Sequence, residues 1–201
     1  LLLSTVKAVK EKCPDVNSAS ASIISFIENK YIATSEGSHV FQKSIGCGPS
    51  VSGTIYQNGK ALRRSYPGSF GWNIKMQGYE NIENADLVTN AGKVGEDIRK
   101  LVQARRCPQE RSDMIIYGDL LAIHVHETVG HVTESDRATD TEWDFAGSTF
   151  LTPEKLGNFQ FGSALTTINA DATIAGGTGS YDFDDELVPG KKVPLLNEGL
   201  F

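Results

Sequence analysis

The sequence predicts an α+β fold in which an antiparallel β-meander is followed by a long helix, a strand–helix pair and further β-strands. Three observations predict it. Apolar residues alternate with serines from Ser18 onward, which is typical of strands with one solvent-facing side. Apolar residues then follow helical spacing between Leu87 and Val102. Finally, a short apolar run at 114–117 leads into a second apolar segment that carries histidines.

Residues 1–78 are predicted to form the end of an N-terminal α/β region with an antiparallel sheet. Residues 1–12 have helical spacing and stop at Cys13-Pro14. Three turns would divide the next part into about four strands, namely Glu28-Asn29-Lys30, Ser35-Glu36-Gly37 and Gln57-Asn58-Gly59. We interpret this sheet as a scaffold; the alternative, that an edge strand pairs with a peptide substrate, stays open. Phe70 and Trp72 are expected to anchor the loop that follows.

Residues 79–201 are predicted to form a helix, the motif region and the start of an incomplete β-rich region. The helix is expected at 82–106, capped by Asn81 or Asn84 and stopped by Pro108. A short strand at 114–117 would precede the motif helix. Later strands are expected at 164–170 and 192–196, with a hairpin turn at 197–199.

Composition and charge exclude several classes of protein. The net charge is −6 and no basic stripe is present, so no nucleic-acid partner is expected. No apolar run is long enough to span a membrane, so no membrane association is expected. The three cysteines are odd in number and lack CxxC spacing, which favours a reducing cytoplasm. Because no initiator methionine is present and the first residues already have helical spacing, we expect a piece of a longer protein.

The chemistry-bearing stretch is His126-Glu127-Thr128-Val129-Gly130-His131. Neutral imidazole is a common zinc ligand, and a carboxylate beside a bound water can take its proton. Histidines five residues apart point about 140° away from each other on an ideal helix. The backbone must therefore depart from that ideal, and a π-bulge or a helix end at Gly130 would let both rings converge.

The residues alone leave alternatives at this stretch. A core helix with two satisfied histidines is the plain structural interpretation. His124 is a rival metal ligand, because it lies seven residues from His131 and thus on the same face of a regular helix. Glu134 or Asp136 could bond to a histidine's second nitrogen, as partners of metal ligands commonly do.

At these residues the sequence resembles the TldD/PmbA family, whose catalytic members carry His-Glu-x-x-x-His. The similarity runs from about Ser18 to the end of the chain and is strongest after Tyr117. It includes Val132-Thr133-Glu134-Ser135-Asp136-Arg137, the run from Phe150 to Gly157, and Leu195-Leu196-Asn197-Glu198-Gly199. The Asp184-Asp185-Glu186 segment also matches, although Leu187 stands where the family has glycine.

The resemblance implies a zinc metallopeptidase in which His126 and His131 bind zinc and Glu127 is the general base. It also implies unfolded or extended peptide substrates, and a homodimer or a heterodimer with a related, motif-less subunit. The family's third zinc ligand is a downstream cysteine, whereas Cys13, Cys47 and Cys107 all precede the motif. We therefore expect residues 1–201 alone to bind zinc weakly.

Two other functions remain as alternatives. The chain could be a non-catalytic binding or regulatory subunit of a TldD/PmbA-type complex, although it keeps both histidines and the glutamate. A non-hydrolytic iron site with two histidines and one carboxylate is disfavoured, because neighbouring helical residues such as His126 and Glu127 point about 100° apart.

Overall fold

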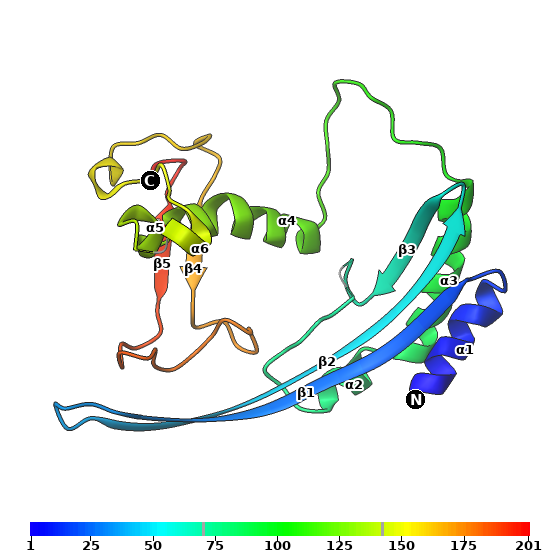
Figure 1. Ribbon diagram of the computed structural model, residues 1–201, viewed down its shortest axis with the longest axis horizontal. Coiled ribbons are helices and arrows are strands. Elements are labelled where there is room, and N and C mark those ends of the chain that lie inside the picture. Colours follow the sequence, from blue (N-terminus) through cyan, green and yellow to red (C-terminus); the bar gives the residue numbers. More distant parts are fainter. Residues whose placement is uncertain (70, 142) are drawn as a thin grey trace. The chain divides into compact units, whose positions relative to one another are not determined.

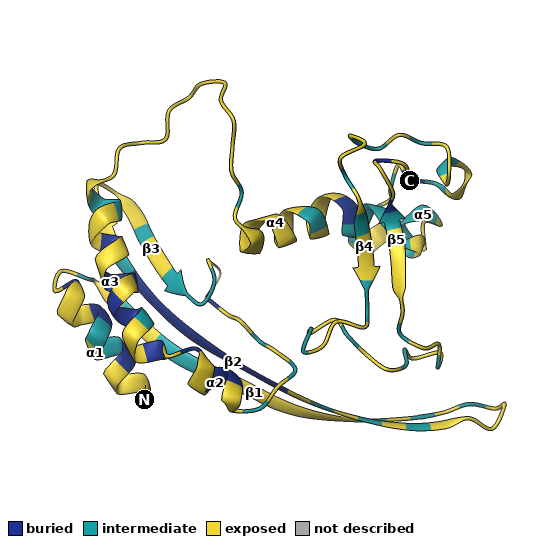
Figure 2. Ribbon diagram, turned by 180° about the vertical axis from the view of Figure 1, so that it is seen from behind, coloured by how far each residue is buried: buried dark blue, intermediate teal, exposed yellow. Residues whose placement is uncertain are grey.

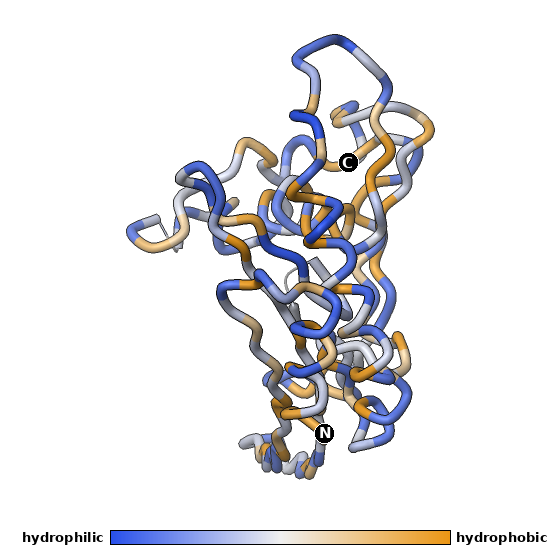
Figure 3. The backbone as a smooth tube through the Cα atoms, turned by 90° about the vertical axis from the view of Figure 1, so that its right-hand side faces the viewer, coloured by the Kyte–Doolittle hydropathy of each residue, from blue (hydrophilic) through white to orange (hydrophobic). Residues whose placement is uncertain are grey.

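The computed structural model describes residues 1–69, 71–141 and 143–201, which form two compact units. The first unit contains residues 1–113 with 175–178, and the second contains 114–174 with 179–201. The mixture of helices and antiparallel strands confirms the α+β class. Figure 3 shows hydrophobic and hydrophilic stretches alternating along the backbone, and no described helix is both long and apolar enough to cross a membrane.

The first unit is a three-stranded antiparallel sheet with helices on one face (Figure 1). Strands β1 (Ser18–Ala33), β2 (His39–Gln57) and β3 (Lys60–Tyr66) lie in that order. The chain turns at 34–38 and at Asn58-Gly59, as the sequence predicts. The turn predicted at 28–30 is wrong, because β1 continues through it and pairs residue by residue with β2. The sheet therefore has three strands.

Helices α1 (Leu2–Lys12), α2 (Glu80–Asn84) and α3 (Leu87–Gln103) belong to the same unit as the sheet. Their apolar side chains meet β2 in a core made of Val9, Cys13, Val51, Ala85, Leu87, Ala91, Val94 and Ile98. Because α3 buries its apolar stripe in this core, it lies with the sheet, whereas the division predicted at residue 78 placed it in the second part of the chain.

The predicted helix at 82–106 is two helices, because the backbone breaks at Ala85 and Asp86. Asp86 has a φ of 42°, a left-handed conformation that a continuous helix does not allow. Neither Asn81 nor Asn84 caps a helix. Asn81 is instead buried, and its amide donates to the backbone oxygens of Cys47 and Asn73 at 2.8 and 3.0 Å. It thereby ties α2 to β2. Phe70, the other predicted loop anchor beside Trp72, lies outside the described residues.

The second unit carries the motif helix and a small antiparallel sheet of β4 (Ile168–Asp171) and β5 (Lys192–Leu196). The motif segment runs from α4 (Gly118–Val125) through η1 (His126–Gly130) and η2 (His131–Thr133) into α5 (Ser135–Ala138). The short helices α6 (Trp143–Ala146) and η3 (Pro153–Lys155) follow. β5 and the turn at 197–199 confirm the sequence prediction, and β4 is shorter than the strand predicted at 164–170.

The strand predicted at 114–117 is not formed. Met114, Ile115 and Tyr117 are 78–91% exposed, and no partner strand lies beside them in the described part of the chain. A strand needs such a partner for its hydrogen bonds, so an apolar run without one stays irregular. The same lack of cover affects α4, which is largely apolar but has no buried residue among those described (Figure 2).

Candidate metal centre

The turn that carries the two histidines is a π-helix. The backbone N–H of His131 donates to the oxygen of His126, five residues earlier, so that η1 holds one residue more than an α-helical turn. Gly130 has φ −54° and ψ −63° and continues the helix rather than ending it. The widened turn predicted from the spacing is thus confirmed, and of its two predicted forms the chain adopts the π-helix.

Threonines stabilise this irregular segment by bonding to its backbone oxygens. The Thr128 hydroxyl donates to His124 at 2.6 Å, and that of Thr133 donates to Val129 and Gly130 at 3.0 and 2.9 Å. Widening a helical turn displaces backbone acceptors from their regular partners, and neighbouring hydroxyls satisfy them. Val129, in the middle of this turn, is 3% exposed and anchors the turn to its unit.

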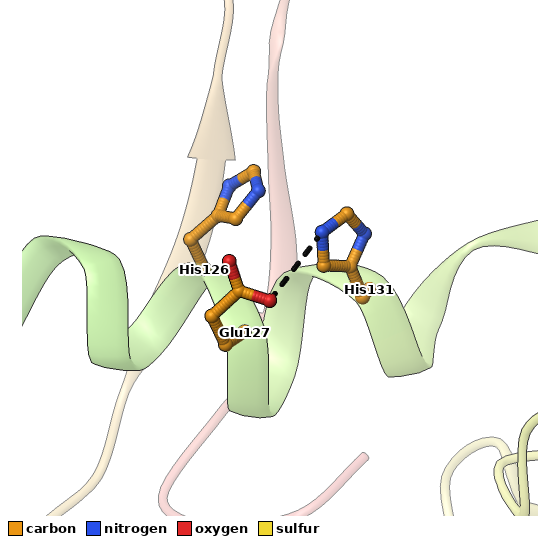
Figure 4. Close-up of side chains that lie close together, drawn as sticks. All are labelled: His126, Glu127 and His131. Carbon is orange, nitrogen blue, oxygen red and sulfur yellow. Dashed lines mark ion pairs between the residues drawn. The ribbon is translucent and has the colours of Figure 1, made fainter. Parts of the chain in front are cut away.

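The π-helix brings both imidazoles and the Glu127 carboxylate together (Figure 4). The His126 and His131 ring centroids are 4.5 Å apart, with the planes at 76°. The Glu127 carboxylate lies 3.7 Å from Nε2 of His131. One possible ligand atom from each of the three residues lies within 4.8 Å of the others. His124, the rival ligand on a regular helix, is not part of this group.

Glu134 occupies the other side of His131. Its Oε1 lies 2.8 Å from Nδ1 of His131, and its Oε2 accepts a 2.6 Å hydrogen bond from Nε of Arg137. Partial burial would raise the pKa of Glu134, but the hydrogen bonds from Arg137 and His131 and their charges outweigh it and hold that pKa below its ordinary value. An ionised Glu134 can only accept at this contact, so the Nδ1–H of His131 donates the hydrogen bond and Nε2 keeps the lone pair.

Arg137 is the residue at this centre that sequence reasoning did not single out. Its side chain is 21% exposed and bridges the Glu134 carboxylate to the backbone oxygen of Ala146, which it reaches through Nη1 at 2.6 Å. The spacing of Glu134 and Arg137, three apart, was the available signal. Asp136, the other acid expected near a histidine, instead accepts from the backbone N–H of Arg137 at 2.9 Å.

The donor set fits a zinc-like ion. Two imidazoles and a carboxylate lie close together, one imidazole is oriented by an anionic partner, and His126 and Glu127 are exposed to solvent. His126 and His131 would hold the ion, and the remaining coordination positions would face water, substrate or a further protein ligand.

Comparison with known proteins places this chain in a family. Residues 1–106 match the PmbA/TldA metallopeptidase central domain, and residues 109–201 match the C-terminal domain of the same family. A metalloprotease of Methanocaldococcus jannaschii is 27% identical over the whole chain, which spans 41% of that relative. A metalloprotease of Synechocystis is 31% identical over 71% of the chain and 27% of the relative. The chain thus spans less than half of the length of these relatives.

Two solved structures share the fold. A protein described as a modulator of DNA gyrase, from Bacteroides thetaiotaomicron, has a TM-score of 0.67 at 17% identity, over 99% of this chain and 43% of its own. TldE from Thermococcus kodakarensis has a TM-score of 0.62 at 15% identity, over 100% of this chain and 42% of its own. With both domains matched in order along the sequence, the chain belongs to the PmbA/TldA metallopeptidase family.

Proposed function

We propose that this chain carries the catalytic centre of a zinc-dependent peptidase, with His126 and His131 as metal ligands and Glu127 as general base. The observation that supports it most is the convergence of one possible ligand atom from each of the three side chains within 4.8 Å at a π-helix. Zinc, when bound, lowers the pKa of a coordinated water and polarises a carbonyl.

The chain's own residues have distinct tasks in this proposal. Glu127 has a side chain that is 60% exposed, so its carboxylate can accept a proton from the attacking water and pass it to the leaving amine. His131 is held through Nδ1 by Glu134, which keeps Nε2 directed at Glu127's side of the ring. Glu134 therefore orients a ligand and is not itself proposed to bind the metal.

The proposed substrates are unfolded or extended peptides, because the scissile carbonyl carbon must come within about 3–3.5 Å of the attacking water beside Glu127, a position that segments of folded proteins seldom reach. The proposed assembly is a homodimer, or a heterodimer with a related subunit, in the cytoplasm. The family relationship supports a peptide substrate, and the exposed side chains of His126 and Glu127 leave them accessible to one.

The test is Glu127→Gln in the complete gene product, measured for metal content and for cleavage of an unstructured peptide. Loss of a general base is expected to reduce turnover by about 10²–10⁴ while the metal is retained. The matched control is Glu11→Gln on the exposed side of α1, which should change neither quantity. Normal turnover in Glu127→Gln would refute the role of Glu127. A wild-type protein that binds metal but cleaves no peptide would instead indicate a binding subunit.

A further inference from the structure

The ends of β1 and β2 nearest their shared turn form an arm, residues 26–46, that extends past the helices of its own unit (Figure 1). Ile27, Tyr31, Phe41 and Ile45 lie on one face of the arm and are 43–78% exposed. The Tyr31 and Phe41 rings stack at 4.6 Å, which orders this face without covering it. A two-stranded ribbon exposed in this way is marginally stable by itself, so we expect a partner for it.

The outer edge of β1 is open to pairing. β1 pairs with β2, and in the described parts of the chain no strand pairs with its other edge. The arm segment of β1 has neither a bulge nor a proline to protect that edge. The N–H of Thr34 donates to the oxygen of Ser38, so even-numbered residues of this unbroken ladder direct their backbone groups at β2. Odd-numbered residues such as Asn29 direct theirs outward.

Charge decides which registers a second copy of this edge could adopt. In an antiparallel pair of two β1 edges, residues whose backbone groups point away from β2 lie opposite residues of the same kind in the other copy. With twofold symmetry, the axis therefore passes midway between the two copies of one residue. An axis at Glu28 would set two glutamates opposite one another, and an axis at Lys30 would set two lysines opposite. An axis at Asn29 sets Glu28 opposite Lys30 of the other copy, twice.

The register centred on Asn29 also matches apolar residues. It sets Ile27 opposite Tyr31 of the second copy and Phe26 opposite Ile32, each of them twice. Between the two copies, Glu28 and Lys30 would form non-hydrogen-bonded pairs, because their backbone groups point at β2. Opposing side chains approach most closely in such pairs. No register shifted by one step along the strand combines opposite charges with these apolar pairs.

We propose that β1 of the arm pairs antiparallel with β1 of a second copy of this chain about an axis at Asn29, which joins two sheets into one. This surface specifies the homodimer suggested under the proposed function, and it needs neither metal nor peptidase activity. A test of the pairing can therefore fail while the metal centre stands, and the reverse also holds.

The first test is Asn29→Cys in the complete gene product with the exposed Cys107 changed to serine. Directly opposed residues of a hydrogen-bonded pair have Cα atoms about 5.5 Å apart, within disulfide range. Mild oxidation should give a disulfide-linked dimer, and reduction should return it to single chains. The parent protein, which carries Cys107→Ser alone, should give no such dimer. Gln42→Cys, on the strand that does not form the edge, is the matched control and should give none. Equal cross-linking of both variants, or of neither, overturns the proposal.

The second test exchanges the charges, and it is read as the dimer dissociation constant by analytical ultracentrifugation. Glu28→Lys and Lys30→Glu each set like charges opposite one another twice, and each should weaken the dimer by about tenfold or more. The double exchange restores opposite charges and should return the constant to within about threefold of wild type. A monomeric wild type, or a double exchange as weak as the single ones, overturns the proposal. So does loss of the Asn29→Cys cross-link on adding an extended peptide, since the edge would then be a peptide-docking strand.

Discussion

The two ring nitrogens of His131 have different neighbours, and this difference decides which nitrogen is free to bind a metal ion. Nδ1 meets a glutamate that Arg137 holds in place, while Nε2 faces Glu127. A carboxylate on the outer nitrogen fixes both the tautomer and the ring orientation of a ligand histidine. The lone pair of His131 therefore lies on Nε2, on the side of the ring where His126 also lies.

We expect Glu134→Gln to weaken zinc binding by about 10–100-fold, because a neutral amide fixes the His131 tautomer less strongly and releases Arg137. Asp136→Asn is the matched control. The Asp136 carboxylate accepts a hydrogen bond from the backbone N–H of Arg137, and the side-chain oxygen of asparagine can accept the same bond, so zinc affinity should change little. Competition titration with a chelating dye measures both variants. Equal loss of affinity in the two would show that the contact between Glu134 and His131 has no special role.

A second residue-scale prediction separates the two histidines that the sequence left open. The π-helix turns His126, not His124, toward His131. His126→Ala should lose bound zinc, whereas His124→Ala should retain the wild-type stoichiometry. Metal content after gel filtration decides between them. Zinc lost only from His124→Ala would mean that the segment becomes a regular helix when it binds metal.

Much of this centre could be predicted from residue types and spacing alone. A five-residue separation of histidines requires a widened turn, and the structure contains one. Arg137 could not be predicted, because its role depends on a contact with the Ala146 backbone in a later loop. Nor could the choice of Glu134 over Asp136, which follows from how the 3-10 turn at 131–133 directs the chain into α5.

At the scale of elements, close packing of α1 on α3 depends on glycine. A Cβ added at Gly95 would lie 2.6 Å from the backbone oxygen of Val9, whereas one at Gly92 would meet only the Lys12 side chain, at 3.7 Å. Both glycines lie in the same helix and both lower its intrinsic stability. They differ only in what surrounds them, which makes them a matched pair.

We expect Gly95→Ala to destabilise the first unit by about 1–3 kcal/mol, because backbone must move to admit the methyl group. Gly92→Ala should stabilise it by about 0.5–1 kcal/mol through helix propensity. The Cys13 thiol is buried, and burial together with the charge of Asp15 raises its pKa. The rate at which a thiol reagent labels Cys13 therefore reports how often this core opens. The exposed Cys107 serves as internal reference. Equal labelling of Cys13 in the two variants would show that the α1–α3 contact is looser than the structure has it.

The errors in predicting strands share one cause: the local sequence does not show which segment, if any, a strand will pair with. Polar residues at 28–30 look like a turn, but their pairing with residues 42–44 of β2 extends the strand through them. An apolar run at 114–117 looks like a strand, but no described strand pairs with it. Conversely, β5 and its turn were predicted well, since Glu198 and Gly199 both adopt the positive φ that their turn requires.

At the scale of the whole molecule, the chain is organised as a sheet-and-helix unit and a separate unit that carries the candidate metal centre. The segment 104–117 joins them and has no regular structure. Its residues are almost all exposed, including Arg105, Arg106 and Arg111. Few contacts hold such a segment, so its backbone can enter a protease active site without unfolding either unit.

Limited trypsin digestion is therefore expected to cut first after Arg105, Arg106 or Arg111, giving two fragments that correspond to the two units. Arg63 and Arg64 provide a control within the same chain, since they are also exposed but lie in β3, where pairing with β2 holds the backbone. Cleavage there requires β3 to detach from β2, which costs free energy. Cleavage in the joining segment has no such cost, because that segment has no regular structure to break. A time course read by mass spectrometry gives the order of cuts. First cleavage at Arg63 or Arg64 would mean that β3 detaches more readily than the structure indicates, and that the joining segment is protected by contacts outside the described residues.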